Sequence, residues 1–131
     1  MPASYQIDVA RRLVISRGVG YVTEAELLTH QRQLQHDPAF VPTFRQLWDC
    51  TAVTGGRVTA AGVRTLAAVT VFQPGTPRAI VVPGLLAYGL ARMFQIWRSL
   101  HGERIAVFRE LHAAQAWLEE VGVPTVHQEA R

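Results

Sequence analysis

The sequence contains no lysine, so all 13 of its basic residues are arginine. These arginines are scattered along the chain, and the formal net charge is only +3. Because proteins that bind nucleic acids concentrate basic residues in one run or on one face, we expect no nucleic-acid partner. A bias in coding composition explains scattered arginine better than bidentate recognition of anions does.

Cysteine is nearly absent, because Cys50 is the only one. An intrachain disulfide is therefore excluded, and nothing indicates secretion. The opening stretch, MPASYQIDVARRLV, has one acid and two arginines before any long apolar run, unlike a signal peptide. The longest uncharged apolar run, 79–91, is too short to cross a membrane. We expect a cytoplasmic protein with no membrane span.

The stretch from Arg78 to Leu100 is the most informative part of the chain. Ala79–Val82 is apolar without alternation, which is typical of a strand covered on both faces, and the following Pro-Gly pair ends it. The next 16 residues, 85–100, predict a long apolar helix. Its polar side chains Arg92, Gln95 and Arg98 recur every third residue, which predicts one narrow solvent-exposed stripe.

The whole chain, 1–131, is predicted to be one α/β domain with an ordered core at about 5–122 and a loose tail at 123–131. Apolar periodicity and turn residues predict the order β-β-α-β-α-β-α-β-α. We expect strands at 5–9, 12–18, 43–49, 79–82 and 104–108, and helices at 24–35, 60–72, 85–100 and 110–120. Such alternation predicts a mixed, mostly parallel five-stranded sheet with an N-terminal β-hairpin and four covering helices.

Two local signals mark helix starts. Thr23 and Glu26 form a capping-box pattern at the first helix, and Thr59 is a predicted N-cap of the second. Periodicity of the first helix predicts that its leucines face inward and that His30, with Gln31 and Gln33, faces solvent. The segment 51–58, which contains Gly55-Gly56, is predicted to be a turn.

This element order resembles the SpoIIAA-like fold of STAS domains and anti-sigma-factor antagonists. Several stretches also resemble a bacterial family of small, uncharacterised SpoIIAA-like proteins, over about residues 5–122. The stretches are the opening hairpin, His36-Asp37-Pro38-Ala39-Phe40, Gln46-Leu47-Trp48-Asp49, Arg78-Ala79-Ile80-Val81-Val82, Gly89-Leu90-Ala91-Arg92-Met93 and Val107-Phe108-Arg109. The resemblance implies a fold, and a regulatory or protein-interaction role.

In partner-switching STAS proteins, a serine at the start of a helix is phosphorylated by a cognate kinase. In this sequence Leu47-Trp48-Asp49 resembles the strand end that precedes the serine motif in those proteins. The serine motif itself would correspond to residues 58–62. Ala60 then occupies the serine position, and no acid precedes it. Thr59 is the only hydroxyl there, and helix capping explains it. We expect no phosphorylation switch at this helix.

Asp49, Cys50 and Thr51 are predicted to lie where a parallel strand ends, the usual ligand site of open α/β sheets. Cys50 could be a nucleophile, but the five histidines are scattered and none has a recognised Cys-His or metal-ligand spacing. We therefore favour an inert buried thiol, no metal and no cofactor.

Asp49 is predicted to accept backbone hydrogen bonds. The segment 54–57 could hold an anion, although a flexible turn explains it better.

The predicted third helix is the best candidate for a working surface. Core packing accounts for most of its large side chains, but one helix cannot bury its whole circumference on a sheet. The surplus predicts either an apolar pocket or a self-association surface. The candidate residues are Tyr88, Met93, Phe94, Ile96 and Trp97, with Arg92 and Arg98 at the rim.

We interpret the sequence as a non-enzymatic regulatory or interaction module that contacts a second copy of itself, as a homodimer, or another protein. The alternative is a binder of a small apolar or lipid-like molecule. The two hypotheses differ in one structural respect, since a ligand binder needs a cavity of a few hundred cubic ångströms, whereas an interaction module needs a filled core and a flat apolar patch.

Overall fold

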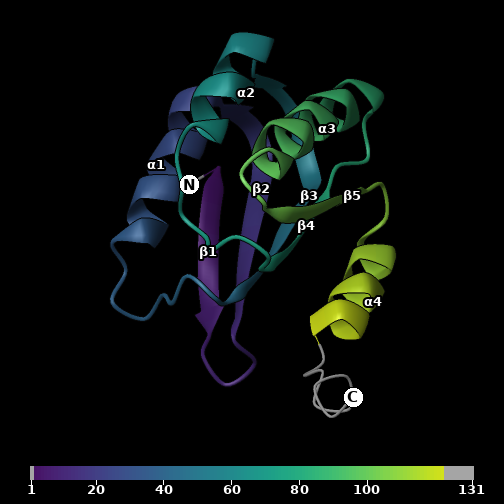
Figure 1. Ribbon diagram of the computed structural model, residues 1–131. Coiled ribbons are helices and arrows are strands. Elements are labelled where there is room, and N and C mark those ends of the chain that lie inside the picture. Colours follow the sequence, from purple (N-terminus) through teal and green to yellow (C-terminus); the bar gives the residue numbers. More distant parts are fainter. Residues whose placement is uncertain (1, 123–131) are drawn as a thin grey trace.

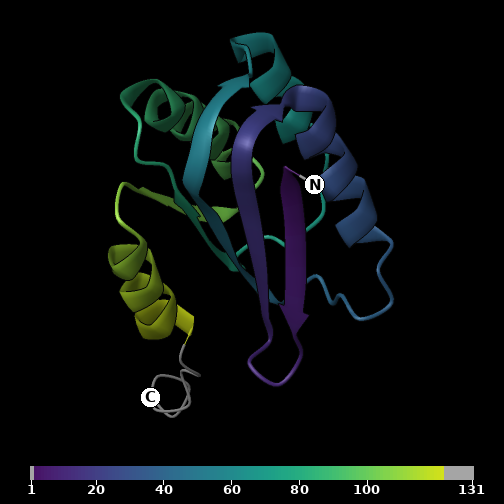
Figure 2. The same ribbon diagram turned by 180° about the vertical axis from the view of Figure 1, so that it is seen from behind.

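The computed structural model describes residues 2–122 as a five-stranded sheet with helices on both faces (Figures 1 and 2). The strands are Ala3–Asp8 (β1), Leu13–Thr23 (β2), Arg45–Arg57 (β3), Pro77–Val81 (β4) and Arg104–Phe108 (β5). The helices are Glu24–Gln35 (α1), Ala60–Ala67 (α2), Leu85–Ser99 (α3) and Leu111–Gly122 (α4). The predicted element order is confirmed, and the predicted tail at 123–131 lies outside the described residues.

The strands follow one another across the sheet in the order β1-β2-β3-β4-β5. β1 and β2 form an antiparallel hairpin, and the three remaining pairs are parallel. Arg12, with φ of 53°, closes the hairpin turn. The predicted mixed, mostly parallel sheet with an N-terminal hairpin is therefore confirmed.

Side-chain alternation along the central strands separates two cores. On one face, Leu13, Leu47 and Val81 pack against Ala114 and Leu118 of α4. The opposite face is covered by α1, α2 and α3, and there the sheet presents both apolar side chains and a row of buried polar ones. This second face holds the candidate site. No helix among residues 2–122 is long and apolar enough to span a membrane.

β2 and β3 are much longer than predicted, and they extend beyond the end of β4 (Figure 2). The prediction of a turn at 51–58 was wrong, because Gly55 and Gly56 pair within the sheet with Tyr21 and Val22. A Cβ atom at Gly56 would lie 2.6 Å from the Val22 carbonyl oxygen. Glycine here permits close approach of two strands rather than a reversal of the chain.

The same extension corrects the predicted strand end at Asp49, Cys50 and Thr51, which lie within β3. The strands that stop at this level are β4 and β5, since Val81 pairs with Asp49 on one side and with Phe108, the last residue of β5, on the other. The second helix was also predicted too long. It ends at Ala67, and the buried side chains of Val71 and Phe72 belong to the loop that follows.

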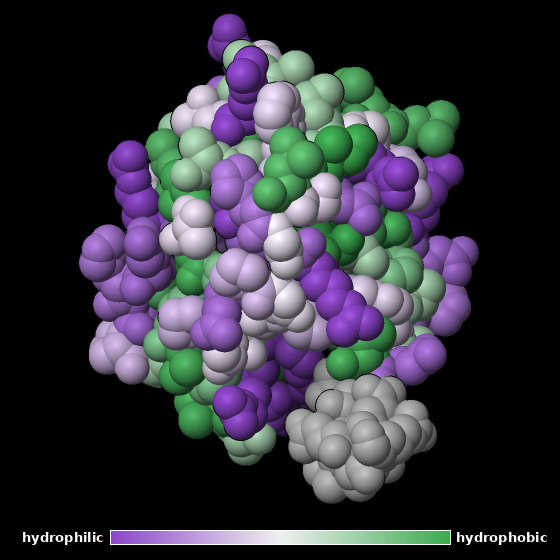
Figure 3. Space-filling view, viewed as in Figure 1, coloured by the Kyte–Doolittle hydropathy of each residue, from purple (hydrophilic) through white to green (hydrophobic). Residues whose placement is uncertain are grey.

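The prediction that Arg98 belongs to a solvent-exposed stripe on α3 was wrong, because Arg98 is only 1% exposed. Gln95 is also turned inward and donates to the Ile105 carbonyl oxygen of β5 at 2.6 Å. Arg92 alone of the three is exposed. The outward positions of α3 instead include Leu85 and Leu86, which are 75% and 81% exposed. The space-filling view shows hydrophobic atoms over this end of the helix (Figure 3).

Candidate functional site

A cavity of about 540 Å³ lies between the sheet and the three helices that cover its second face. Its wall is mostly apolar, with contributions from Leu27 of α1, Val63 and Leu66 of α2, Leu86, Leu90, Ala91 and Phe94 of α3, and Trp48, Cys50, Ile80 and Val82 of the sheet region. Volumes of this size are typical of small-molecule sites. β3 continues beyond the last residue of β4 before the chain turns into α2. The cavity therefore lies between α2 and α3, beyond the end of the shorter strand β4.

Arg78 of β4 is the charged residue in the cavity wall, although its residue surface is only 5% exposed. Its guanidinium lies over the Phe72 ring, 4.2 Å from the centroid, and 5.8 Å from the centroid of Phe94. Arg78 Nε donates to Gln46 Oε1 at 3.0 Å, and Nη1 donates to Glu103 Oε1 at 2.6 Å. Burial lowers the pKa of Arg78 to about 10, so the group remains cationic at neutral pH.

Glu103 joins two buried arginines, because its other carboxylate oxygen accepts from Arg98 of α3. Arg98 also donates through Nη1 to the Ala67 carbonyl oxygen at 2.6 Å, which ties α3 to the end of α2. The inward turn of Arg98 therefore has a structural reason. This cluster of Arg78, Arg98 and Glu103 carries two positive charges and one negative charge.

His30 continues the polar row toward the N-terminal strands. The predicted outward position was wrong, because His30 is 2% exposed and its Nε2 lies 2.9 Å from Ser16 Oγ. Ser16 Oγ also accepts from Gln46 Nε2 at 3.0 Å, which links His30 to Arg78. Burial, reinforced by the Arg78 charge, lowers the pKa of His30 to about 4 and keeps the ring neutral.

Cys50 lines the cavity, and its environment opposes reactivity. Burial, with a smaller contribution from the Asp49 carboxylate, raises the pKa of the thiol to about 12. Since the thiolate is the nucleophile, the thiol at neutral pH is almost entirely in the unreactive form.

We therefore expect native protein to react slowly with a disulfide reagent such as Ellman's reagent, and to react rapidly once unfolded in urea. Cys50 is the only thiol, so one absorbance trace reports on it alone. Rapid reaction of the native protein below neutral pH would indicate a thiolate and would contradict the expectation.

The remaining β3 candidates lie apart from the cavity. Asp49 Oδ1 accepts from the Thr51 backbone N–H at 2.9 Å and from its hydroxyl at 2.6 Å, as predicted for a backbone-binding carboxylate. Asp49 Oδ2 also lies 3.8 Å from Arg17 Nη2. Asp49 and Leu47 occupy alternate positions on the α4 face of β3, whereas Cys50 faces the cavity.

Thr59 caps α2, as predicted, because its hydroxyl accepts from the Gly62 N–H at 3.0 Å. The same hydroxyl donates to Glu24 Oε1 at 2.7 Å, and this carboxylate also accepts the Thr59 N–H. These bonds lower the pKa of Glu24. The contacts connect the starts of α1 and α2, which gives Thr59 a structural role. The absence of a phosphorylation switch remains a prediction.

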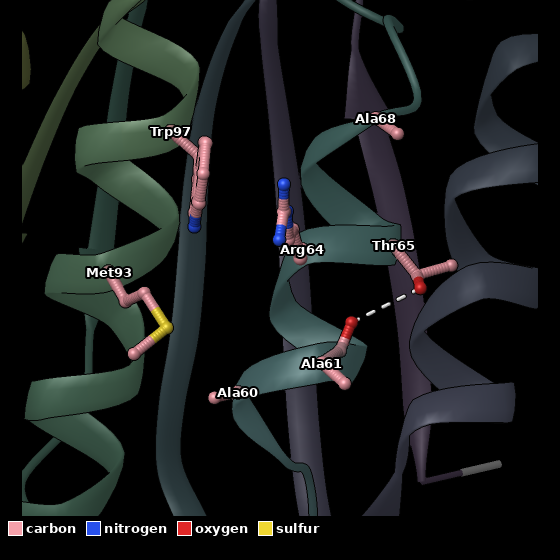
Figure 4. A pocket seen from close by; sticks show the side chains of 7 residues that line it. All are labelled: Ala60, Ala61, Arg64, Thr65, Ala68, Met93 and Trp97. Atoms are coloured by element: carbon pink, nitrogen blue, oxygen red, sulfur yellow. Dashed lines mark hydrogen bonds between the residues drawn. The ribbon is translucent and has the colours of Figure 1, made fainter.

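Two other candidates on α3, Met93 and Trp97, line a separate, open groove between α2 and α3 (Figure 4). Met93 and Trp97 project toward α2, and the Arg64 guanidinium lies over the Trp97 ring, 4.7 Å from its centroid. Small residues of α2 form the opposite side of the groove. Trp97 is therefore already partly covered by its own chain.

The structure thus distributes the sequence candidates over several places. Phe94 and Cys50 line the cavity, Tyr88 packs beside it, Met93 and Trp97 line the groove, Arg92 is exposed, and Arg98 lies in the buried cluster. Sequence reasoning did not select Arg78, Gln46, Glu103 or Gln31 for the site. One signal was available in the sequence, because Arg78 directly precedes the apolar stretch 79–82 and Glu103 lies just before the stretch 105–108.

Residues 2–122 contain no group of three or more histidine, cysteine, aspartate or glutamate side chains arranged to hold a metal ion. No protein-family model matches the sequence, and no curated protein matches it. The structure is similar to the crystal structure of an uncharacterised DUF3478-family protein with a SpoIIAA-like fold from Shewanella loihica PV-4. The TM-score is 0.53 at 18% sequence identity, covering 88% of this chain and 93% of that one. The fold is therefore SpoIIAA-like, as the sequence resemblance implied.

Proposed function

We propose that this protein binds a small apolar or lipid-like molecule in the cavity between α1, α2, α3 and the sheet. The observation that carries the proposal is the 540 Å³ volume with its largely apolar wall. A ligand there would remove apolar surface from water on both partners, which is the main driving force of such binding. The cavity reaches Leu85 and Leu86 at the exposed start of α3, which gives a ligand an apolar entrance.

Non-enzymatic binding accords with the side chains in the wall. The Cys50 thiol is held protonated, and the His30 ring is engaged with Ser16 behind the wall. A nucleophile with an adjacent base, the arrangement that covalent catalysis requires, is not formed by these two residues.

Native mass spectrometry of freshly purified protein tests the proposal, together with thermal unfolding in the presence of decanol. We expect a co-purified small molecule or a raised melting temperature with added decanol. An Ala91→Phe variant should lose both effects, because Ala91 lines the cavity. Ala116→Phe, on the exposed face of α4, is the matched control. A folded wild-type protein that carries nothing and gains no stability from decanol would refute the proposal.

A second candidate function is an interaction module, and exposed apolar residues on α3 favour it. Besides Leu85 and Leu86, Ile96 and Leu100 at the other end are mostly exposed. We propose that this helix supplies the surface of a homodimer, with Trp97 as an anchor, since truncated aromatic anchors weaken interfaces strongly.

Analytical ultracentrifugation tests the dimer. We expect the wild-type protein to sediment as a dimer at micromolar concentration, and Trp97→Ala to weaken the dimer by more than about 1 kcal/mol. Trp117→Ala on α4 is the matched control, and it should reduce stability through lost packing without changing assembly. A monomeric wild-type protein would end this hypothesis.

A further inference from the structure

The charged cluster behind the cavity wall carries more positive than negative charge, and Arg78 is the member of the cluster that lines the cavity. Arg78 and Arg98 share a single carboxylate, that of Glu103. Both arginines are at least nine-tenths buried, so water screens the remaining positive charge poorly. The neutral His30 ring adds nothing to offset it.

Hydrogen-bond donors are in excess at the same place. Two of the three Arg78 nitrogens are engaged, by Gln46 and by Glu103, whereas Nη2 has no acceptor among residues 2–122. Buried Arg98 Nε likewise has no acceptor within the described part of the chain. Both Glu103 oxygens are already occupied by the two arginines. Arg78 is cationic and lines a largely apolar cavity, so a negatively charged acceptor placed there would gain charge-assisted hydrogen bonds from it.

We propose that the cavity binds an amphipathic monoanion, an alkyl-chain carboxylate of the fatty-acid class, with its carboxylate on Arg78 and its alkyl chain in the apolar space between the helices. The inference rests on the proposed function and specifies its ligand. Arg78 is the point where the charged cluster reaches the cavity wall. One carboxylate would balance the cluster of two arginines and one glutamate.

The shape of the cavity fixes the orientation of the ligand. The polar end is at β4, and the wall from there to Leu86 and Leu90 is apolar, so the alkyl chain runs toward the start of α3. Gln31 also lines the cavity, and its buried Oε1 has no partner within residues 2–122.

Three probes with the same alkyl chain separate the contributions of head and tail in the wild-type protein. Decanoate, decanol and decyltrimethylammonium are titrated by calorimetry at about pH 8, where the carboxylate is fully ionised. We expect decanoate to bind about tenfold or more tightly than decanol, because its head gains charge-assisted bonds to Arg78, and decyltrimethylammonium to bind most weakly. This comparison does not depend on any variant remaining folded.

Substitution of Arg78 locates the head. In Arg78→Met the remaining Arg98–Glu103 pair is balanced in charge, and the methionine retains an apolar stem beside Phe72. We expect this variant to lose the preference for decanoate while binding decanol within about twofold of wild type. Arg92→Met, on the exposed side of α3, is the matched control and should keep the preference.

The possible results of these titrations test the ligand class, the proposed function and the role of Arg78 separately. Equal affinity for decanoate and decanol in the wild-type protein would overturn the carboxylate inference and leave the apolar-ligand function standing. Binding of none of the three probes would overturn both. A decanoate preference that survives in folded Arg78→Met would place the head elsewhere and would overturn the assignment of Arg78.

Discussion

Replacing Glu103 by glutamine is expected to lower the free energy of unfolding by about 3–5 kcal/mol. The substitution keeps the side-chain shape but removes the one negative charge between Arg78 and Arg98. Burial, with a smaller contribution from the Arg98 charge, already lowers the pKa of Arg78, and without the carboxylate nothing in the cluster would oppose these two effects. The packing of α3 against the end of α2 would be weakened as well, because Arg98 also donates to the Ala67 carbonyl oxygen.

Urea unfolding followed by circular dichroism measures this effect. Glu119→Gln is the matched control, because Glu119 is exposed and lies 4.0 Å from Arg11, so its loss should change stability by less than about 1 kcal/mol. A folded Glu103→Gln protein within about 1 kcal/mol of wild type would show that water reaches and screens the cluster.

Local signals in the sequence were sufficient where an element depends mainly on its own residues. The bounds of α1 and β5 match the prediction, and the capping box of Thr23 and Glu26 forms as expected. The hairpin also formed, because two consecutive strands with a tight connection have few other ways to pair. These features need no knowledge of distant residues.

The length of β3 could not be predicted because it depends on pairing with β2. Gly55-Gly56 has the composition of a turn, yet the strand continues because Gly56 lies against the Val22 backbone. The requirement for glycine is visible only when both strands are in register. The same error placed the predicted ligand site at Asp49, Cys50 and Thr51, as the end of a strand that in fact continues to Arg57.

Arg98 shows why the site itself was only partly predictable. Helical periodicity correctly places Arg98 on the same face as Gln95. Periodicity cannot tell, however, whether that face is exposed to solvent or is buried with an oppositely charged partner. The partner, Glu103, lies in the turn before β5 and is brought into place by the sheet. The surplus apolar residues of α3 were predicted to form either a pocket or a self-association surface, and of these residues Phe94 lines the cavity.

The second large effect concerns pH. Acidification from about pH 6.5 to about pH 4 is expected to lower the free energy of unfolding by about 3 kcal/mol through His30 alone. In the folded protein the pKa of His30 is lowered from 6.5 to about 4, first by burial and then by the Arg78 charge. Below pH 6.5 the unfolded chain therefore takes up a proton that the folded chain does not. Stability falls until the folded protein is protonated as well.

Urea unfolding at a series of pH values tests this difference, with His30→Gln as the diagnostic variant. The groups packed around the ring are Ser16, Tyr5, Trp48 and Arg78, and none of them is expected to titrate in this interval. His30→Gln should therefore lose less stability than wild type on acidification, by about 3 kcal/mol, whatever its stability at neutral pH. His112→Gln, at an exposed position of α4, should retain the wild-type dependence. Parallel curves for wild type and His30→Gln would mean that the ring is protonated in the folded protein, and that the polar row accepts another positive charge beside Arg78.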